Sequence, residues 1–297
     1  MHAEPRYTYG GDEFIVVELS EEMSLEANFQ VTIITQALQS QNLAGVIDIC
    51  PGNASYMVRY NPDELSADVL MEQLKSAAAL VTQLQETKLS ARIVDVPILF
   101  EDPWTHDAVM KARDRHQDPN ATDLEYAARV NGFASKEAFI EALTDAPYLV
   151  SMTGFVPGLP WCFQIKPRNE QIEVPKYVRP RTYTPERAFG FGGAFACIYP
   201  VQGAGGYQLF GIAPGPIFDP QQRLPDFRDS LVFPQPGDIF YFRSITMEEY
   251  ERIREQVAEG TFTYKTRAID FVPEDVLRDP KAFAQKVSEV LHSDRSH

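Results

Sequence analysis

The chain has 297 residues, of which 44% are hydrophobic and 23% are charged, and its formal net charge is -15. This composition is typical of a globular protein with a full core and about two domains, and it excludes a disordered or fibrous chain. A surface that binds nucleic acid needs a basic face to neutralise phosphates. The acidic balance therefore argues against a nucleic-acid partner.

The N-terminal sequence lacks a cationic segment followed by an apolar run, and no stretch of about 18 apolar residues occurs. We therefore expect no signal peptide, no membrane contact and a cytoplasmic location. Cys50, Cys162 and Cys197 are far apart and odd in number, so we expect neither a disulfide framework nor a metal site. We expect Cys162 and Cys197 to be buried structural thiols. The five histidines lie near the termini or in polar helical sequence, which argues against a histidine-based triad.

Residues 1–100 alternate between strand and helix patterns. Apolar and β-branched runs predict strands at 13–19, 46–50, 55–60 and 91–99. Apolar residues at helical spacing predict helices at 24–38 and 66–86. The resulting order, β-α-β-β-α-β, is that of the ferredoxin-like split unit, so we predict an N-terminal α+β domain over 1–100.

Residues 101–147 change character and predict a helical insert. Its helices are expected at 105–115, 123–130 and 135–142. From residue 148 to residue 242, glycine, proline, aromatic and β-branched residues alternate with closely spaced turn signals, which predicts a β-barrel or a sandwich. Two further helices, at 246–259 and 279–291, complete a second domain over 148–297.

The loop at 153–161 contains two glycines and two prolines, which leave its backbone few accessible conformations. Around Pro157 and Gly158, main-chain N–H groups can therefore point outward and bind an oxygen atom. The alternative is a rigid connection between domains, and the sequence leaves both interpretations open.

Three cations, Lys176, Arg179 and Arg181, gather in a proline-rich stretch of this acidic chain. A guanidinium holds a carboxylate, carbamate or phosphate through parallel hydrogen bonds, and lysine supplies a point charge. An anionic or carboxylated substrate is therefore indicated. The alternative is a solvated strand face on which prolines protect a sheet edge.

A glycine-rich hairpin follows the cations. Its glycines form two pairs, Gly192 with Gly193 and Gly205 with Gly206. Glycine inside strands marks a bulge or a close approach, so the pairs indicate a crowded site. Tyr199 and Gln208 could hydrogen-bond an amide or a urea, or they could be satisfied barrel residues. The glycines lack the spacing and lysine of a nucleotide loop.

Taken together, these stretches resemble the allophanate hydrolase subunit 1 family, also called the Kip inhibitor family or the family of the 5-oxoprolinase B subunit. They also resemble one half, the C and D part, of the carboxyltransferase domain of urea carboxylase, which is the nearer branch. The motifs that carry the resemblance lie at 154–158, 180–182, 190–193, 198–200 and 205–211.

The resemblance implies an α+β domain and a cyclophilin-like β-barrel that pair with a homologous subunit 2-type chain to complete a site between them. In the carboxylase branch, biotin on a carrier delivers a carboxyl group to a urea-like nitrogen. In the oxoprolinase branch, ATP drives opening of a lactam. Biotin, its carrier, a biotin carboxylase and ATP would all belong to other chains. Other members of the group inhibit a sensor kinase, which would make the chain an interaction module.

On this basis we expect a subunit of a urea carboxylase-like, biotin-dependent carboxyltransferase acting on urea or a related amide. The alternatives are the B subunit of an ATP-dependent 5-oxoprolinase or allophanate hydrolase and a non-catalytic kinase inhibitor. Lys176 and Arg181 are the expected catalytic cations, and main-chain N–H groups near Gly192 and Gly193 are expected to stabilise an oxyanion. The expected substrate-binding residues are Pro157, Gly158, Thr182, Gly192, Gly193, Tyr199, Gly205, Gly206 and Gln208, with no metal.

Overall fold

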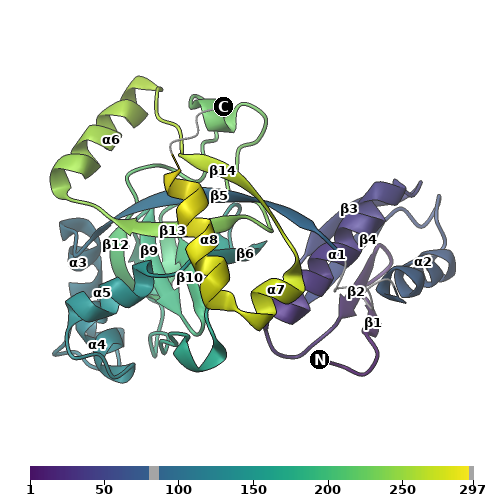
Figure 1. Cartoon of the computed structure of the whole chain (residues 1–297), viewed down its shortest axis with the longest axis horizontal. Coiled ribbons are helices and arrows are strands. Elements are labelled where there is room, and N and C mark those ends of the chain that lie inside the picture. The colour runs from purple at the N-terminus through teal and green to yellow at the C-terminus, as the bar shows by residue number, and fades with distance from the viewer. Residues whose placement is uncertain (80–86, 294–297) are drawn as a thin grey trace. The chain divides into compact units, whose positions relative to one another are not determined.

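The computed structural model describes residues 1–79 and 87–293. The chain forms two compact units of mixed α and β structure (Figure 1). The first unit comprises Met1–Ser90 and Asp270–Pro280, and the second comprises Ala91–Ile269 and the segment from Lys281 onward. Each unit has its own hydrophobic core.

The first unit contains a four-stranded antiparallel sheet in the order β1-β2-β4-β3. Its strands are β1 (Arg6–Tyr9), β2 (Phe14–Glu18), β3 (Val46–Pro51) and β4 (Ser55–Tyr60). Its helices are α1 (Leu25–Gln41), α2 (Ala67–Ala79) and α7 (Pro273–Arg278). The helix expected at 66–86 is confirmed as far as residue 79, and positions 80–86 lie outside the described residues.

Helix α1 begins and ends where local chemistry requires. The hydroxyl of Ser24 accepts a hydrogen bond from the N–H of Ala27 at 3.1 Å, which satisfies a free donor of the first turn. The helix ends at Asn42, whose φ of 47° lies in the left-handed region. The buried face of α1 packs on the sheet, where the helix contacts β3 and β4, and this core includes Ile15, Val17, Val31, Ile34 and Val58.

The expected closing strand at 91–99 is not part of this sheet, and the predicted β-α-β-β-α-β order is wrong at that point. Strand β5 (Leu89–Phe100) instead pairs in parallel with β13 (Ile239–Ser244) in the larger sheet. The short strand β1 pairs with β2 at the edge where a closing strand would lie. Because β5 is buried without interruption from Val96 to Phe100, it requires apolar cover on both faces.

The larger sheet has eight strands in the order β12-β9-β10-β7-β6-β13-β5-β14, and β12 pairs in addition with β5. Strand β12, at one end of this order, therefore also pairs with β5 near the other end. The strands not yet named are β6 (Tyr148–Thr153), β7 (Pro160–Gln164), β9 (Ala188–Gly192), β10 (Phe195–Ile198), β12 (Gln208–Ile212) and β14 (Thr266–Phe271). A separate pair consists of β8 (Arg181–Thr184) and β11 (Gly203–Gly205).

The expected helical insert is present, although the helix expected at 105–115 ends at Met110 and a 3₁₀ turn follows it. Its helices are α3 (Pro103–Met110), the 3₁₀ turn η2 (Arg113–Arg115), α4 (Asp123–Val130) and α5 (Lys136–Thr144). In Figure 1, α3, α4 and α5 lie together beside the larger sheet, and α3 and α4 contact β12. The remaining helices are η3 (Arg168–Glu170), η4 (Pro225–Phe227), α6 (Met247–Glu259) and α8 (Pro280–His292).

The predicted division at residues 100 and 147 differs from the observed units. Strand β5 carries the chain into the second unit from Ala91, and the insert belongs to that same unit. Residues 270–280 return to the first unit, where α7 contacts α1. The pairing of β5 with β13, which are far apart in sequence, decides these boundaries. Local sequence patterns do not show such a pairing.

Aromatic rings fill the centre of the larger sheet. The ring of Phe189 lies 4.8 Å from that of Phe242 and 5.8 Å from that of Phe100, measured between centroids. Cys162 and Cys197 are buried, as expected, and burial raises the pKa of both thiols. Both therefore remain protonated at neutral pH and pack as small apolar side chains. Over the described ranges, no helix combines the length and the apolar character needed to cross a membrane.

We expect Gly211→Ala to destabilise the protein by about 1–3 kcal/mol, because the new methyl group has no room. A Cβ at this position would lie 2.5 Å from the carbonyl oxygen of Leu99, where β12 pairs with β5. Urea unfolding measures the change. Gly203→Ala is the matched control, because a Cβ there would meet no atom within 4 Å. Equal midpoints for the two variants would contradict this account of the close approach.

Candidate functional site

The cation-rich stretch and the second glycine pair meet in the structure. Strand β8 pairs with β11, and Arg181 lies opposite Gly205 in that register. The N–H of Tyr177 donates to the carbonyl of Gly206 at 2.8 Å. A Cβ on Gly205 would lie 2.6 Å from the hydroxyl of Tyr199, which explains why glycine is needed there. Two stretches that are separate in sequence thus form one region.

The ring of Tyr207 joins this region to the first glycine pair. The ammonium of Lys176 lies 5.3 Å from the centroid of the Tyr207 ring, a cation–π distance. On Gly192, a Cβ would lie only 2.3 Å from Cδ1 of the same ring. Lys176 and Gly192 therefore both lie against Tyr207. The cation-rich stretch and both glycine pairs therefore lie around Tyr207, while the expected anion site there stays a prediction.

Arg181 is buried, with 1% of its surface exposed. Its Nη1 donates to the carbonyl of Tyr207 at 2.6 Å, and its Nη2 donates to the hydroxyl of Thr184 at 3.3 Å. Its guanidinium carbon lies 4.6 Å from the centroid of the Tyr177 ring. Among the described residues no carboxylate forms an ion pair with Arg181, and its Nε has no hydrogen-bond partner. The guanidinium thus holds Tyr207 from inside, whereas the sequence led us to expect direct contact with a ligand.

The expected site residues divide into accessible and buried groups. Pro157, Lys176, Thr182 and Gly193 are exposed, and Gly206 is half-buried. Gly158, Arg181, Gly192, Tyr199, Gly205 and Gln208 are buried. Lys176 is consequently the charged member of the set that a ligand can reach in this conformation.

Both polar atoms of the Gln208 amide are bonded within the protein. Its Nε2 donates to the carbonyl of Pro175 at 2.8 Å, and its Oε1 lies 2.8 Å from Nε2 of His116. Gln208 is completely buried. Gln208 is therefore a buried residue whose hydrogen bonds are made within the protein, which is the alternative that the sequence left open.

One of the expected oxyanion donors, the Gly193 amide, is also occupied. The N–H of Gly193 donates to the carbonyl of Val174 at 2.7 Å, and the N–H of Val174 donates back to Gly193 at 2.9 Å. Gly192 pairs with Phe195 in the sheet. Gly193 has a φ of 61°, so glycine suits this turn for conformational reasons. The Gly193 amide is not free to stabilise an oxyanion.

The proline-rich loop packs on the same region. Val156 and Leu159 contact a cluster that contains Tyr199 and Tyr207. Gly158 has a φ of 81°, and a Cβ there would lie 3.1 Å from the methyl groups of Val232. The loop is thus fixed against the tyrosines that flank Lys176.

Sequence reasoning missed a buried polar network beneath these residues. Asp123, which is 1% exposed, pairs with Arg113 and accepts from the Tyr177 hydroxyl at 2.6 Å and the Leu209 N–H at 2.8 Å. His116 is also buried and lies between the Tyr126 and Tyr177 rings, 4.8 Å from each. The sequence around His116 is polar and helical. The residues next to His116 in sequence give no sign that it is buried, because the residues that bury it, such as Tyr177 and Gln208, are distant in sequence.

Burial raises the pKa of Tyr177, Tyr199 and Tyr207 above the usual tyrosine range. For Tyr199 the positive charge of Arg181 opposes this effect. All three hydroxyls therefore stay protonated at neutral pH. They contribute rings and neutral hydroxyls and no negative charge beside Lys176.

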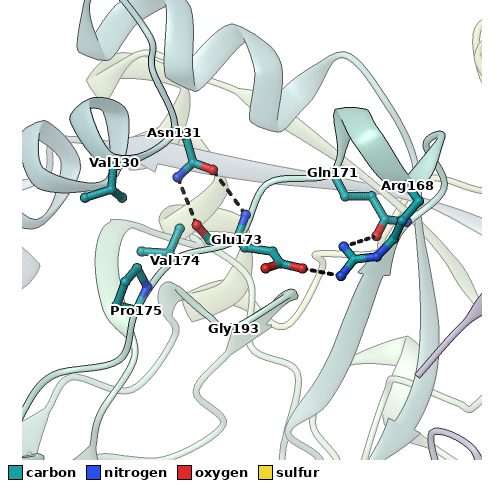
Figure 2. Close-up of a pocket in the computed structure, with 8 residues that line it drawn as sticks. All are labelled: Val130, Asn131, Arg168, Gln171, Glu173, Val174, Pro175 and Gly193. Atoms are coloured by element: carbon teal, nitrogen blue, oxygen red, sulfur yellow. Dashed lines mark hydrogen bonds and ion pairs between the residues drawn. The ribbon is translucent and has the colours of Figure 1, made fainter. Parts of the chain in front are cut away.

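An open groove of about 640 Å³ lies next to the cation-rich stretch. Its lining includes Pro175 and Gly193, the chain neighbours of Lys176 and Gly192. Figure 2 shows the amide of Asn131 bonded to both the N–H and the carbonyl of Glu173, at 3.2 and 3.0 Å, which fixes one wall. Arg168 forms an ion pair with Glu173 at 2.6 Å. The groove thus offers access beside Lys176 without a free cation of its own.

One histidine–carboxylate group in the first unit has its ligand atoms close enough to hold a metal ion. It consists of His2, Glu18 and Glu21. Both carboxylates already pair with Arg6, at 3.3 and 2.6 Å, and the charge of Arg6 disfavours a cation there.

The family described as the carboxyltransferase domain, subdomain C and D, matches residues 5–227. The chain belongs to this family, and the resemblance seen in the sequence motifs is confirmed. Urea amidolyase of Lachancea kluyveri is 26% identical over 298 residues, covering 97% of this chain and 16% of that protein. The B subunit of 5-oxoprolinase from Bacillus subtilis is 24% identical over 254 residues, covering 83% of this chain and 95% of that protein.

A solved structure supports the same fold. The K. lactis urea amidolyase matches with a TM-score of 0.81 at 23% identity, over 98% of this chain and 18% of that chain. This chain therefore spans less than a fifth of the urea amidolyases that it matches.

We expect Gly192→Ala to turn the Tyr207 ring away from Lys176 and to destabilise the protein by about 1–3 kcal/mol, because the ring occupies the space that a Cβ needs. Urea unfolding measures the stability, and near-ultraviolet circular dichroism reports the aromatic packing. Gly193→Asn is the control, since asparagine tolerates a positive φ and a Cβ on residue 193 would meet no atom within 4 Å. A wild-type dichroism spectrum for Gly192→Ala would contradict the proposed crowding.

Proposed function

We propose that the chain supplies one half of a carboxyltransferase-type site that acts on urea or a related amide, as a subunit of a urea carboxylase-like, biotin-dependent enzyme. The observation that carries the proposal is the exposed Lys176 ammonium, held over Tyr207 where the cation-rich stretch meets both glycine pairs. Membership of the carboxyltransferase family supports it. We also propose that the larger sheet corresponds to the expected cyclophilin-like barrel, which the pairing between β12 and β5 supports.

In this proposal Lys176 binds the negatively charged oxygen of a carboxyl or carbamate group. Arg181 adds a second positive charge behind Tyr207, and burial weakens its screening by water. The region can thus stabilise negative charge that develops during transfer. Lys176 fits the chemistry of a carboxylated biotin, which would supply the carboxyl group from another chain. ATP would likewise act elsewhere, and a homologous second subunit would complete the site.

A second candidate, the B subunit of an ATP-dependent 5-oxoprolinase, is favoured by one observation. This chain covers 95% of the length of the B. subtilis protein, whereas it covers 16% of the L. kluyveri urea amidolyase. The same cation site would then bind the carboxylate of the lactam substrate. Both candidates therefore assign the same role to Lys176 and differ in the partner chains.

We expect Lys176→Ala to lower turnover roughly a hundredfold or more, because a positioned charge would be lost from the transition state. Turnover is measured with the second subunit and a biotin carrier present. The fold should survive, since Lys176 is exposed. Lys75→Ala is the matched control, because Lys75 is also exposed and its ammonium lies 5.9 Å from the Tyr7 ring. Unchanged turnover in Lys176→Ala would remove Lys176 from the site.

ATP turnover in the reconstituted set of chains distinguishes the two candidates. We expect ATP hydrolysis that depends on urea and on the biotin carrier. Hydrolysis that depends on 5-oxoproline and needs no carrier would select the second candidate. Tight binding to a sensor kinase without any turnover would contradict both.

A further inference from the structure

We infer that the buried network of His116, Gln208, Asp123 and Arg113, together with Gln117, positions Lys176. The inference rests on the proposed role of Lys176 and gives a positioning role to these five residues, including Gln208, whose expected contact with the substrate is replaced by contacts within the protein. In the proposed function none of these five side chains contacts the ligand. They act on the backbone on either side of Lys176.

The first part of the network holds the residue before Lys176. The Nε2 of Gln208 donates to the carbonyl of Pro175 at 2.8 Å, so Oε1 of Gln208 must serve as an acceptor. That oxygen lies 2.8 Å from Nε2 of His116, which assigns the proton to this nitrogen. The N–H of Asp118 then donates to Nδ1 of His116 at 2.8 Å. His116 thus connects the start of the 175–177 segment to the helical insert.

The second part holds the residue after Lys176. The hydroxyl of Tyr177 donates to Asp123 at 2.6 Å and accepts from Arg113. The Tyr177 N–H donates to the carbonyl of Gly206 at 2.8 Å. Both ends of the Tyr177 residue, backbone and side chain, are therefore fixed. Breaking a buried ion pair such as Arg113–Asp123 is strongly destabilising, so this part is rigid in the folded state.

The third contact is made to Lys176 itself. The amide nitrogen of Gln117 donates to the Lys176 carbonyl. The backbone of 175–177 is thus held at three consecutive residues, although no named strand or helix includes it. A lysine side chain has a flexible four-carbon stem, so a fixed backbone is what directs its ammonium toward Tyr207. Such positioning is a large part of what a catalytic group needs.

The test observes Lys176 without any substrate. Reductive ¹³C-methylation of the full chain labels each lysine and keeps its charge. Methyl groups over an aromatic ring resonate upfield, so the Lys176 signal should be shifted by the Tyr207 ring. Lys176→Arg identifies the signal by removing it.

We expect Gln117→Ala and His116→Ala to lose most of the upfield shift, so that the signal moves toward the position of an exposed lysine such as Lys111, which pairs with Asp107. His116→Gln should retain it, because a glutamine amide can donate to Gln208 in place of the imidazole. Gln285→Ala is the matched control for Gln117→Ala, since Gln285 is a surface glutamine on α8 that bonds to Glu289 at 2.9 Å. In Gln285→Ala the Lys176 signal should keep the position that it has in the wild-type protein.

Folding is checked by urea unfolding of every variant. Should His116→Ala fail to fold, Gln117→Ala still decides the matter, because Gln117 is an exposed residue. An unmoved Lys176 signal in a folded Gln117→Ala variant would overturn the inference. The proposed function fails by a different result, unchanged turnover in Lys176→Ala, so the two failures are distinguishable.

Discussion

The buried carboxylate of Asp123 is the group on which the rest of this region depends. It pairs with Arg113 and accepts from the Tyr177 hydroxyl and the Leu209 N–H. An unpaired carboxylate in this position would cost several kcal/mol. The folded state must therefore bring together helix α4, strand β12 and the segment before β8. The helical insert is thus part of the site and not a cover placed over it.

This arrangement creates an excess of positive charge in an acidic protein. Arg181 lies inside without a carboxylate partner among the described residues, and Lys176 is exposed, with its ammonium 5.3 Å from the centroid of the Tyr207 ring. The tyrosines around them stay neutral, because burial raises their pKa. These tyrosines therefore add no negative charge beside the two cations.

Local sequence patterns predicted most elements of the fold. The predictions failed where the outcome depends on pairing between residues that are far apart in sequence. Helix α1 follows from its cap at Ser24 and its apolar spacing, which are local features. Strand β5 is recognisable in the sequence but was assigned to the wrong sheet, because an apolar run does not specify its partner. The burial of His116 was missed for a similar reason. Its neighbours in sequence are polar, while Gln208 and Tyr177 bury it from far along the chain.

The sequence alone predicted the class of most segments, the family, and the two stretches that meet around Tyr207. These depend on neighbouring residues and on motif order. Only the tertiary structure decided that Lys176 is accessible, that Arg181 is enclosed, and that the Gly193 amide is already bonded. Exposure and hydrogen-bond occupancy depend on what other segments place around a residue. A cation-rich stretch therefore predicts an anion site, while the fold leaves Lys176 exposed and encloses Arg181.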